Sequence, residues 1–345
     1  MAGEFLGYPF DEELFLHMWG QEPDPVLTAI LNSGAVVNDS YIASQIRDKG
    51  NVYTVPFYNV LSGNTVNYDG ETDITSNETG GGMQTGVVFG RAIGHTARDF
   101  VGELIGNDPM GNIARKVGHF WSKENQKELL NILKAIFGIT SSSTGYAKTF
   151  HETHVLDLTS KTADPYLIGE TDANDLATLA MGDHKQLFSL AIMHSEVAKT
   201  LENKQLLEYW KYTDPNGIQR PMNIASWNGY TVIIDDSVGK TAVGGSGANK
   251  DLYVYPTMLL GQGVIRMAPG RVDKPAEVSR DAFKNGGQET LITRERLTFH
   301  PNGFSFDTSK MASESPTFEE LGKSTSWNIK FNPKAIPMAV LYTNG

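Results

Sequence analysis

The feature that most constrains the fold is a long helical pattern between residues 108 and 137. Asp108 is a good N-cap residue, Pro109 suits the first helical position, and Gly138 stands where helices often end. Apolar side chains recur at helical spacing along one stripe: Ile113, Val117, Phe120, Trp121, Leu130, Leu133 and Phe137. At 1.5 Å per residue such a helix is roughly 45 Å long. It must therefore run along a surface or support something extended.

Before this helix, residues 51–91 read as two strands rich in Tyr, Val and Phe, joined by a polar middle of Gly, Asn, Thr, Asp and Glu. Pro56 removes one backbone donor from the first strand, which confines that strand to an edge or a short pairing. A two-stranded ribbon alone is marginal in water, because it buries too little apolar surface to offset the ordering of its backbone. The ribbon therefore needs another surface to pack against.

The remaining patterns mix strands and helices without a regular strand–helix–strand repeat, which favours an α+β fold over a doubly wound sheet. Residues 1–50 are expected to form an arm with local helices. Further along we expect a strand at 150–159, helices at 172–181 and 184–202, a strand at 229–236, a flexible tip at 244–250, two strand pairs within 253–268 and 290–306, a short helix at 315–322, and a last strand at 335–343.

Composition excludes several classes of protein. A formal charge of −11 argues against sequence-independent nucleic-acid binding, because such proteins need Lys and Arg to displace counterions from phosphates. The absence of cysteine excludes disulfides and thiolate metal sites, and it suits assembly in a reducing cytoplasm. The first residues, MAGEFLGYPFDEELF, lack the features of a secretory signal, and no run approaches the roughly 18 apolar residues of a membrane helix.

Two stretches resemble catalytic motifs. The sequence HETH at 151–154 is one residue short of the zinc-protease pattern, and on a strand His151 and His154 would point to opposite faces. The sequence SVGKT at 237–241 lacks the first glycine of a phosphate-binding loop, because that position is Ile234. A structural role is favoured for both. A nucleotide-binding enzyme remains a distant alternative, with its site formed by Asp235, Asp236, Lys240 and Thr241.

Other candidate residues are interpreted as packing. His194 shares a helical stripe with Leu187, Leu190, Ala191, Val197 and Leu201, which predicts a histidine in the core. Four tryptophans have no basic residues interleaved with them, so core or interface packing is favoured over base stacking: Trp121, Trp210, Trp227 and Trp327. We therefore expect no catalytic, cofactor-binding or metal-binding residues.

The order of these segments resembles the major capsid proteins of tailed bacteriophages with the Hong Kong 97-type fold. The stretches that carry the resemblance are NDPMGNIARKV, MGDHKQLFSLAIMHSEVAK, GYTVIIDD, EVSRDAFKNGGQETLITRERLTFHPNGF and the closing SPTFEEL…SWN. The resemblance implies an N-terminal arm (1–50), an extended loop (51–92), a peripheral domain (93–160 and 266–314) that contains the spine helix, and an axial domain (161–265 and 315–345). It implies a structural protein that self-assembles through pentamers and hexamers into the icosahedral shell around a double-stranded DNA genome.

The resemblance also implies where copies meet. The extended loop would lie across a neighbouring subunit, and the side chains expected in that contact are Tyr53, Val55, Phe57, Tyr58, Val87, Phe89 and Arg91. The flexible tip would lie near the capsomer centre, where it could serve two symmetry environments: Gly244, Gly245, Ser246, Gly247, Asn249 and Lys250.

Two departures from relatives shape the expected partners. No lysine occurs between Lys49 and Lys116, so a covalent lysine link through the loop is not expected. The loop begins by about residue 51, which leaves no room for a folded scaffolding extension, so a separate scaffolding protein is expected. A portal is a further expected partner, and a decoration protein is an additional candidate. The acidic balance suits a wall that encloses DNA without sequence-specific binding. No membrane partner is expected, and the protein is placed in the virion capsid after assembly in the host cytoplasm. A nanocompartment shell of the same fold is the main alternative.

Overall fold

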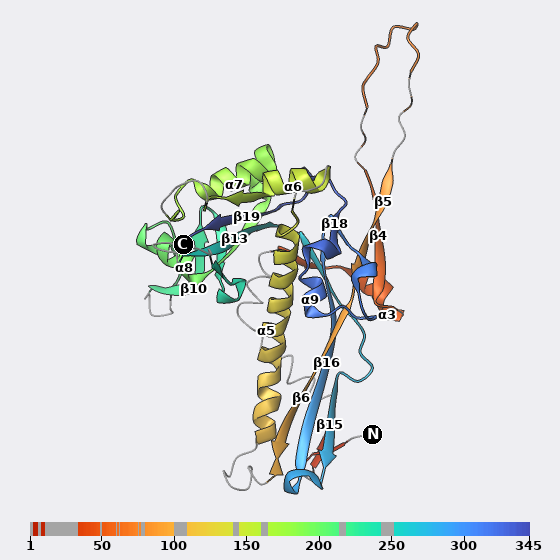
Figure 1. The fold of residues 1–345 in the computed structure, drawn as a ribbon, viewed down its shortest axis with the longest axis vertical. Coiled ribbons are helices and arrows are strands. Elements are labelled where there is room, and N and C mark those ends of the chain that lie inside the picture. The colour runs from red at the N-terminus through yellow and green to blue at the C-terminus, as the bar shows by residue number, and fades with distance from the viewer. Residues whose placement is uncertain are drawn as a thin grey trace.

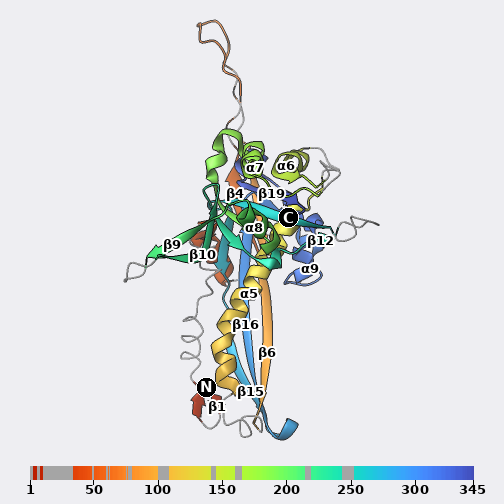
Figure 2. The same ribbon diagram turned by 90° about the vertical axis from the view of Figure 1, so that its left-hand side faces the viewer.

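The structure is a computed structural model, and it describes residues 3–5, 8–10, 34–48, 50–59, 61, 63–74, 76, 80–99, 109–140, 145–159, 165–213, 219–242 and 252–345. Two sheets and one long helix organise the chain (Figure 1). The helix α5 (Pro109–Phe137) runs from one sheet to the other. The loop after β4 projects from one end of the molecule, and the tip of the five-stranded sheet lies at the other end (Figures 1 and 2). The predicted spine helix is thus observed with nearly the predicted bounds.

The larger sheet has eight strands in the order β7-β19-β13-β8-β11-β10-β9, with β12 paired to β13. Its strands are β7 (Val155–Asp157), β8 (Phe188–Met193), β9 (Glu208–Thr213), β10 (Gln219–Trp227), β11 (Tyr230–Ile234), β12 (Thr241–Ala242), β13 (Tyr253–Gly261) and β19 (Met338–Thr343). The pairs β8–β11 and β7–β19 are parallel, and the others are antiparallel.

Both faces of this sheet are buried. Alternate residues of β8 belong to different cores: Ala191 packs with α7 (Asp172–Met181) and α8 (Ser195–Asn203), whereas Leu190 packs with the last turns of α5. A strand covered on both faces is apolar throughout and loses the alternation that marks a half-exposed strand. This explains the wrong prediction of one helix at 184–202: the segment forms η1 (Gly182–Leu187), then β8, then α8.

The smaller sheet has five strands, β15-β16-β14-β3 with β6 also paired to β16. They are β3 (Val36–Asn38), β6 (Phe89–Arg98), β14 (Ile265–Pro269), β15 (Ala276–Asp281) and β16 (Gln288–Pro301). The first half of α5 packs on one face of this sheet, where Val117 and Trp121 meet Leu291, and the Trp121 indole donates to Thr293 at 3.1 Å. One helix therefore fixes the two sheets relative to each other.

Smaller elements complete the structure. They are β1 (Gly3–Phe5), β2 (Tyr8–Phe10), α3 (Ser40–Asp48), β4 (Val52–Tyr58), β5 (Gly81–Val87), α6 (Tyr146–His154), η2 (Asp236–Val238), η3 (Lys284–Gly286), β17 (Phe304–Phe306), η4 (Thr308–Lys310), α9 (Phe318–Leu321), η5 (Ser324–Ser326), β18 (Trp327–Ile329) and η6 (Pro333–Ala335). The short helix α9 is capped by Thr317 and Glu320 in a capping box.

Two further expectations need correction. The predicted strand at 150–159 is α6 followed by the short β7. The four strands expected within 253–268 and 290–306 exist, but they do not pair as two local hairpins: β13 pairs with β8 and β19, β14 with β16 and β3, and β17 with β18. Their hydrogen-bond partners lie far away in the sequence, which local patterns do not reveal.

Candidate assembly interface

The extended loop is anchored to its own chain by the ribbon of β4 and β5. Tyr53 lies opposite Gly86 across the ribbon, and its ring covers the position where a side chain would stand on that glycine. The Thr298 hydroxyl donates to the Val87 carbonyl at 2.8 Å, so the Tyr53 hydroxyl donates to Thr298 at 2.8 Å. Burial raises the pKa of Tyr53 well above its usual value, which keeps the hydroxyl protonated. Tyr53 thus joins the ribbon to β16.

A second buried contact lies on β5. The Gln84 side-chain oxygen accepts from His300 Nε2 and from the Gly303 amide, each at 3.0 Å. The hydrogen on Nε2 leaves Nδ1 unprotonated, as expected for a neutral ring. Burial lowers the pKa of His300 to about 4, so the ring stays neutral near pH 7. The polar ends of Tyr53 and Gln84 therefore both find partners within one chain.

At the outer end of the ribbon, a second aromatic ring of β4 again covers a glycine of β5. Phe57 lies opposite Gly82 and packs edge-on against Phe331, with ring centroids 4.8 Å apart. The Thr85 amide donates to the Ser305 hydroxyl at 3.0 Å. Two aromatic rings of β4 thus each cover a glycine of β5, and β5 contacts β16 and β17.

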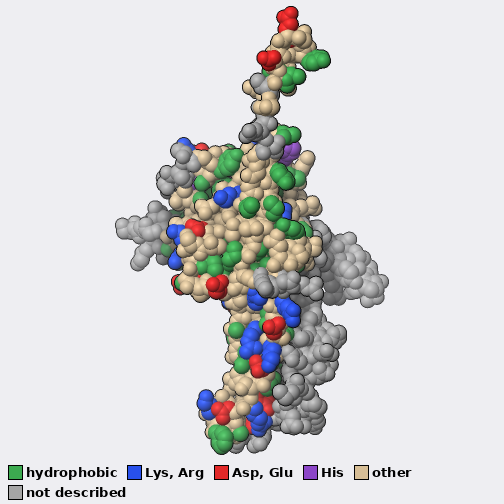
Figure 3. Space-filling model, turned by 90° about the vertical axis from the view of Figure 1, so that its right-hand side faces the viewer, with side chains coloured by type: hydrophobic (Ala, Val, Ile, Leu, Met, Phe, Trp, Pro, Cys, Tyr) green, Lys and Arg blue, Asp and Glu red, His purple; other side chains and the backbone are tan. Residues whose placement is uncertain are grey.

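Beyond Tyr58 the chain leaves the body of the molecule. We call residues 59–80 the distal loop. It carries four acidic residues and no Lys or Arg. Apolar side chains of this region stand in solvent: Tyr58 is 87% exposed, Leu61 79%, Tyr68 92% and Ile74 76%. Figure 3 shows these hydrophobic and acidic side chains on a projecting arm without a basic group. Exposed apolar groups in such a concentration indicate a contact surface.

Asp69 organises the turn of the distal loop. Its carboxylate accepts from the amides of Glu71 and Thr72 at 2.9 and 2.7 Å, and from the Thr72 hydroxyl at 2.7 Å. These hydrogen bonds lower the pKa of Asp69, with the Thr72 hydroxyl as the largest cause. The turn therefore carries a fixed negative charge.

The predicted contact residues fall into two groups. Tyr53, Val55, Val87 and Phe89 are buried inside their own chain. Arg91 is also engaged there, because its Nε donates to Glu128 at 2.6 Å and its guanidinium lies 5.1 Å from the centre of the Phe89 ring. Phe57 is partly buried against Phe331, and Tyr58 is exposed. A contact of these residues with a second subunit stays a prediction, with Tyr58 the most available of them.

Sequence reasoning missed the exposed side chains of the distal loop itself, which are the most accessible apolar groups of the projection. Their signal was present: apolar residues recur in a polar segment without a regular period, in Leu61, Val66, Tyr68 and Ile74. The expected capsomer-centre residues 244–250 lie outside the described residues. Next to that segment, Lys240 Nζ lies 4.1 Å from the centre of the Tyr253 ring.

The two acids of the alternative nucleotide site, Asp235 and Asp236, accept backbone hydrogen bonds at the start of η2 and of α8. Asp235 accepts from the Ser237 amide at 2.8 Å and from the Gln126 side chain. Asp236 accepts from the Ser195 amide at 3.0 Å, at the start of α8. The carboxylates of Asp235 and Asp236 are thus engaged within the chain, whereas Lys240 lies over the Tyr253 ring and Thr241 is in β12.

Two histidine interpretations change. His194 is not a core residue on a helical stripe: it is the N-cap of α8, and its Nδ1 accepts from the Glu196 amide at 3.1 Å. His151 and His154 lie on a helix rather than a strand, so the argument from opposite faces does not apply. His154 is buried and stacks on Phe150, with ring centroids 4.7 Å apart. The structural interpretation of HETH thus rests on packing.

Of the four tryptophans, Trp121, Trp227 and Trp327 are buried, in agreement with the prediction of packing. The side chain of Trp210 lies outside the described residues.

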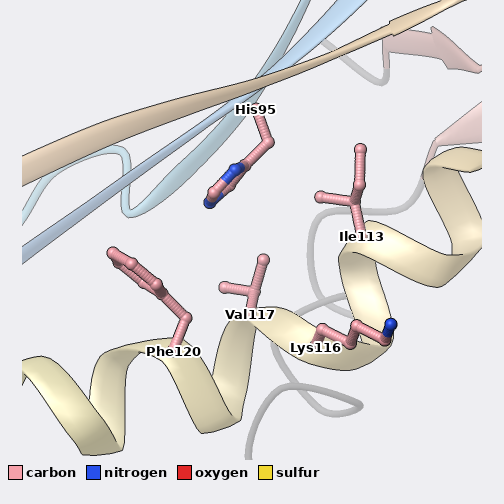
Figure 4. Close-up of a pocket in the computed structure, with 5 residues that line it drawn as sticks. All are labelled: His95, Ile113, Lys116, Val117 and Phe120. Atoms are coloured by element: carbon pink, nitrogen blue, oxygen red, sulfur yellow. The ribbon is translucent and has the colours of Figure 1, made fainter.

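A groove of about 300 Å³ lies between β6 and the first half of α5 (Figure 4). His95 points into it from the strand, and Ile113, Val117 and Phe120 line it from the helix, with Lys116 at its rim. The His95 ring meets Phe120 edge-on at 5.6 Å. The described lining contains no carboxylate, so it provides neither an acid–base pair nor a metal-ligand set.

Across the described part of the chain, no three His, Asp or Glu side chains come together as a metal site. Within the same residues, no helix is both long enough and apolar enough to span a membrane.

Comparison with known structures defines the class of fold. The chain superposes on the capsid of Ralstonia phage GP4 with a TM-score of 0.56 and 12% sequence identity, over 91% of this chain and 88% of that one. It superposes on the capsid of a native GTA particle with a TM-score of 0.52 and 10% identity, over 94% and 92%. The fold is therefore the α+β Hong Kong 97-type fold of tailed-phage capsids, as predicted.

The sequence itself is similar to the major capsid protein of Bacillus phage SPP1, with 28% identity over 312 residues, which cover 90% of this chain and 89% of the relative. No protein-family model matches the chain. The predicted resemblance to tailed-phage major capsid proteins is confirmed, and it extends over nearly the whole sequence.

Proposed function

We propose that this protein is the major capsid protein of a tailed phage and self-assembles into the icosahedral shell around a double-stranded DNA genome. The observation that carries the proposal is the extended loop, anchored at its base in its own chain while its apolar side chains stand in solvent. The similarity to the SPP1 major capsid protein along nearly the full chain supports it. In this proposal the protein has a structural role, in which copies associate and bury surface between them, and we propose that it is not an enzyme.

We also propose the division into an arm, an extended loop, a peripheral domain and an axial domain. The two sheets support it, because the first half of α5 packs on the five-stranded sheet and its last turns pack on the eight-stranded sheet. The helix α6 contacts α7 and β19, which supports placing the end of the first peripheral segment before residue 145 rather than at 160.

In this proposal, copies form pentamers and hexamers, and a separate scaffolding protein guides them in the host cytoplasm. A portal and a decoration protein are further proposed partners in the virion. The absence of lysine between residues 49 and 116 supports a shell without covalent lysine links through this loop. Denaturing electrophoresis of boiled mature particles should therefore release monomers, whereas a ladder of linked subunits would refute this part.

Negative-stain electron microscopy of the expressed protein, alone and with its scaffolding protein, tests the function. Closed shells, tubes or rings of five or six subunits are expected, and a monodisperse monomer at high concentration under both conditions would contradict the proposal. DNA inside particles purified from infected cells distinguishes a phage capsid from the alternative nanocompartment shell of the same fold.

A further inference from the structure

The ribbon of β4 and β5 is attached to the body of the molecule by side chains. Within the described residues its two strands form a separate two-stranded sheet, and no backbone-to-backbone hydrogen bond joins them to another strand. The strands β3, β6, β14 and β15, in contrast, are held in the five-stranded sheet by backbone pairing. The position of the ribbon therefore depends on a few side-chain contacts at its base.

His300 of β16 makes contacts with both strands of the ribbon. The residue is 1% exposed, and Tyr53 of β4 meets its ring edge-on with the ring centroids 5.7 Å apart. Gln84 of β5 accepts from His300 Nε2 at 3.0 Å and also from the Gly303 amide at the same distance. A change in the charge of this one imidazole therefore acts on both strands.

The other ring nitrogen of His300 has no acceptor in place. With the hydrogen on Nε2, Nδ1 is the atom that takes up a proton, and it is buried without a hydrogen-bond partner among the described residues. A buried cation with an unpaired N–H is strongly disfavoured, because it has lost its hydrogen bonds to water. The closed ribbon therefore accommodates the neutral ring only.

The charges around His300 add to this preference. Arg266 of β14 is its cross-strand partner, and directly opposed side chains of neighbouring strands project from the same face. The Arg266 guanidinium donates to Asp39 at 3.2 Å, and Asp39 also accepts backbone hydrogen bonds at the start of α3. Tyr53 is a further titratable group on the ring, and its buried hydroxyl is neutral. Burial first, and Arg266 second, lower the pKa of His300 to about 4, whereas Asp39 acts in the opposite direction.

We propose that His300 is a proton-sensitive latch for the extended loop. When the ring binds a proton, the ribbon lifts from β16, water reaches the imidazolium, and the distal loop becomes free to change direction. The ribbon moves rather than the sheet, because β14 and β16 are joined by backbone hydrogen bonds. Once lifted, the two strands fray, since a lone two-stranded ribbon is marginal in water. The latch belongs to the single chain and does not depend on the proposed shell function.

Linkage gives the size of the effect. In the lifted state the ring is exposed and binds a proton near its ordinary pKa of 6.5, whereas in the closed state it does so only near 4. The closed ribbon is therefore most stable above pH 6.5 and loses stability as the pH falls toward 4. Between pH 7 and pH 5 the equilibrium constant for lifting should rise about twentyfold.

Amide hydrogen exchange of the unassembled full-length protein tests the latch. The protection of the amides that pair β4 with β5, corrected for the effect of pH on the intrinsic exchange rate, should fall about twentyfold from pH 7 to pH 5. His300→Gln can still donate to Gln84 but cannot take up a proton, so its ribbon protection should stay nearly constant. His154→Gln is the matched control: it removes another buried histidine of low pKa and should leave the change in the ribbon intact.

Three results would overturn the latch. They are constant ribbon protection in the wild type, a fall that persists in His300→Gln, and ribbon amides that lose protection together with those of β8 and β13 and to the same level, which indicates global unfolding. If His300→Gln does not fold, NMR titration of the wild-type ring decides the matter. A midpoint below about 5 is expected, and a midpoint near 6.5 with the ribbon still protected would contradict the proposal.

Discussion

Replacing Gly86 with alanine should release the base of the extended loop from its own chain. An added Cβ would overlap the Tyr53 ring, so the ring must leave its site or the two strands must separate. Displacing the ring forfeits roughly 1.5–3 kcal/mol of burial and about 1 kcal/mol from its buried hydrogen bond to Thr298. The two contributions together predict a loss of about 2.5–4 kcal/mol in the stability of the anchored ribbon.

Amide hydrogen exchange of β5, together with urea unfolding, measures this loss. Gly90→Ala is a matched control in the neighbouring strand, because its Cβ would meet Arg296 at an ordinary 3.6 Å, and it should change stability by less than about 0.5 kcal/mol. In a Tyr53→Ala background the added cost of Gly86→Ala should largely disappear, because the clash is gone. An equal cost of Gly86→Ala with and without the Tyr53 ring would refute the reasoning.

Three further predictions concern the same molecule. Stability should fall as the pH drops from 6.5 to about 4, because His154 and His300 bind protons in the unfolded chain but, with a pKa of about 4 each, not in the folded chain. Urea titrations should show a loss in the free energy of unfolding of up to roughly 3 kcal/mol per histidine. A free energy of unfolding that stays constant over this pH range would contradict neutral rings for the two histidines. Arg91→Met should cost about 3–5 kcal/mol by leaving Glu128 buried without its partner, and recovery by the added change Glu128→Leu is the check; an Arg91→Met protein as stable as the wild type would show that the pair is not buried as described. Tyr68→Ser should leave the unfolding midpoint of the monomer unchanged, since the ring is 92% exposed, but should impair shell formation. A lowered midpoint with normal shells would show that Tyr68 stabilises its own chain rather than a contact between copies.

Sequence patterns predicted an element correctly where consecutive residues within that element determine its structure. The helix 109–137 was predictable because its start, apolar stripe and end are all written in consecutive residues. The segment 184–202 was not, because a strand buried on both faces and an amphipathic helix both read as dense apolar sequence. Its true structure depends on β11 and β13, which the sequence supplies some forty to seventy residues later.

The same limit applies to the candidate interface. The ribbon 51–91 was recognisable, but which half of it is anchored depends on Thr298, His300 and Phe331, more than two hundred residues away. Arg91 illustrates the difficulty, because an arginine at the end of a ribbon suggests an exposed contact, and only the fold brings Glu128 to it. The absence of basic residues from the distal loop, in contrast, was visible in the sequence.

Hydrogen exchange of the distal loop, compared between monomers and assembled shells, tests the central claim most directly. The account predicts that residues 61–76 exchange freely in the monomer and become protected in the shell, while the anchored strands β4 and β5 are protected in both. Equal exchange of the distal loop in the two states would show that this loop does not complete its contacts on neighbouring copies, and would contradict the account.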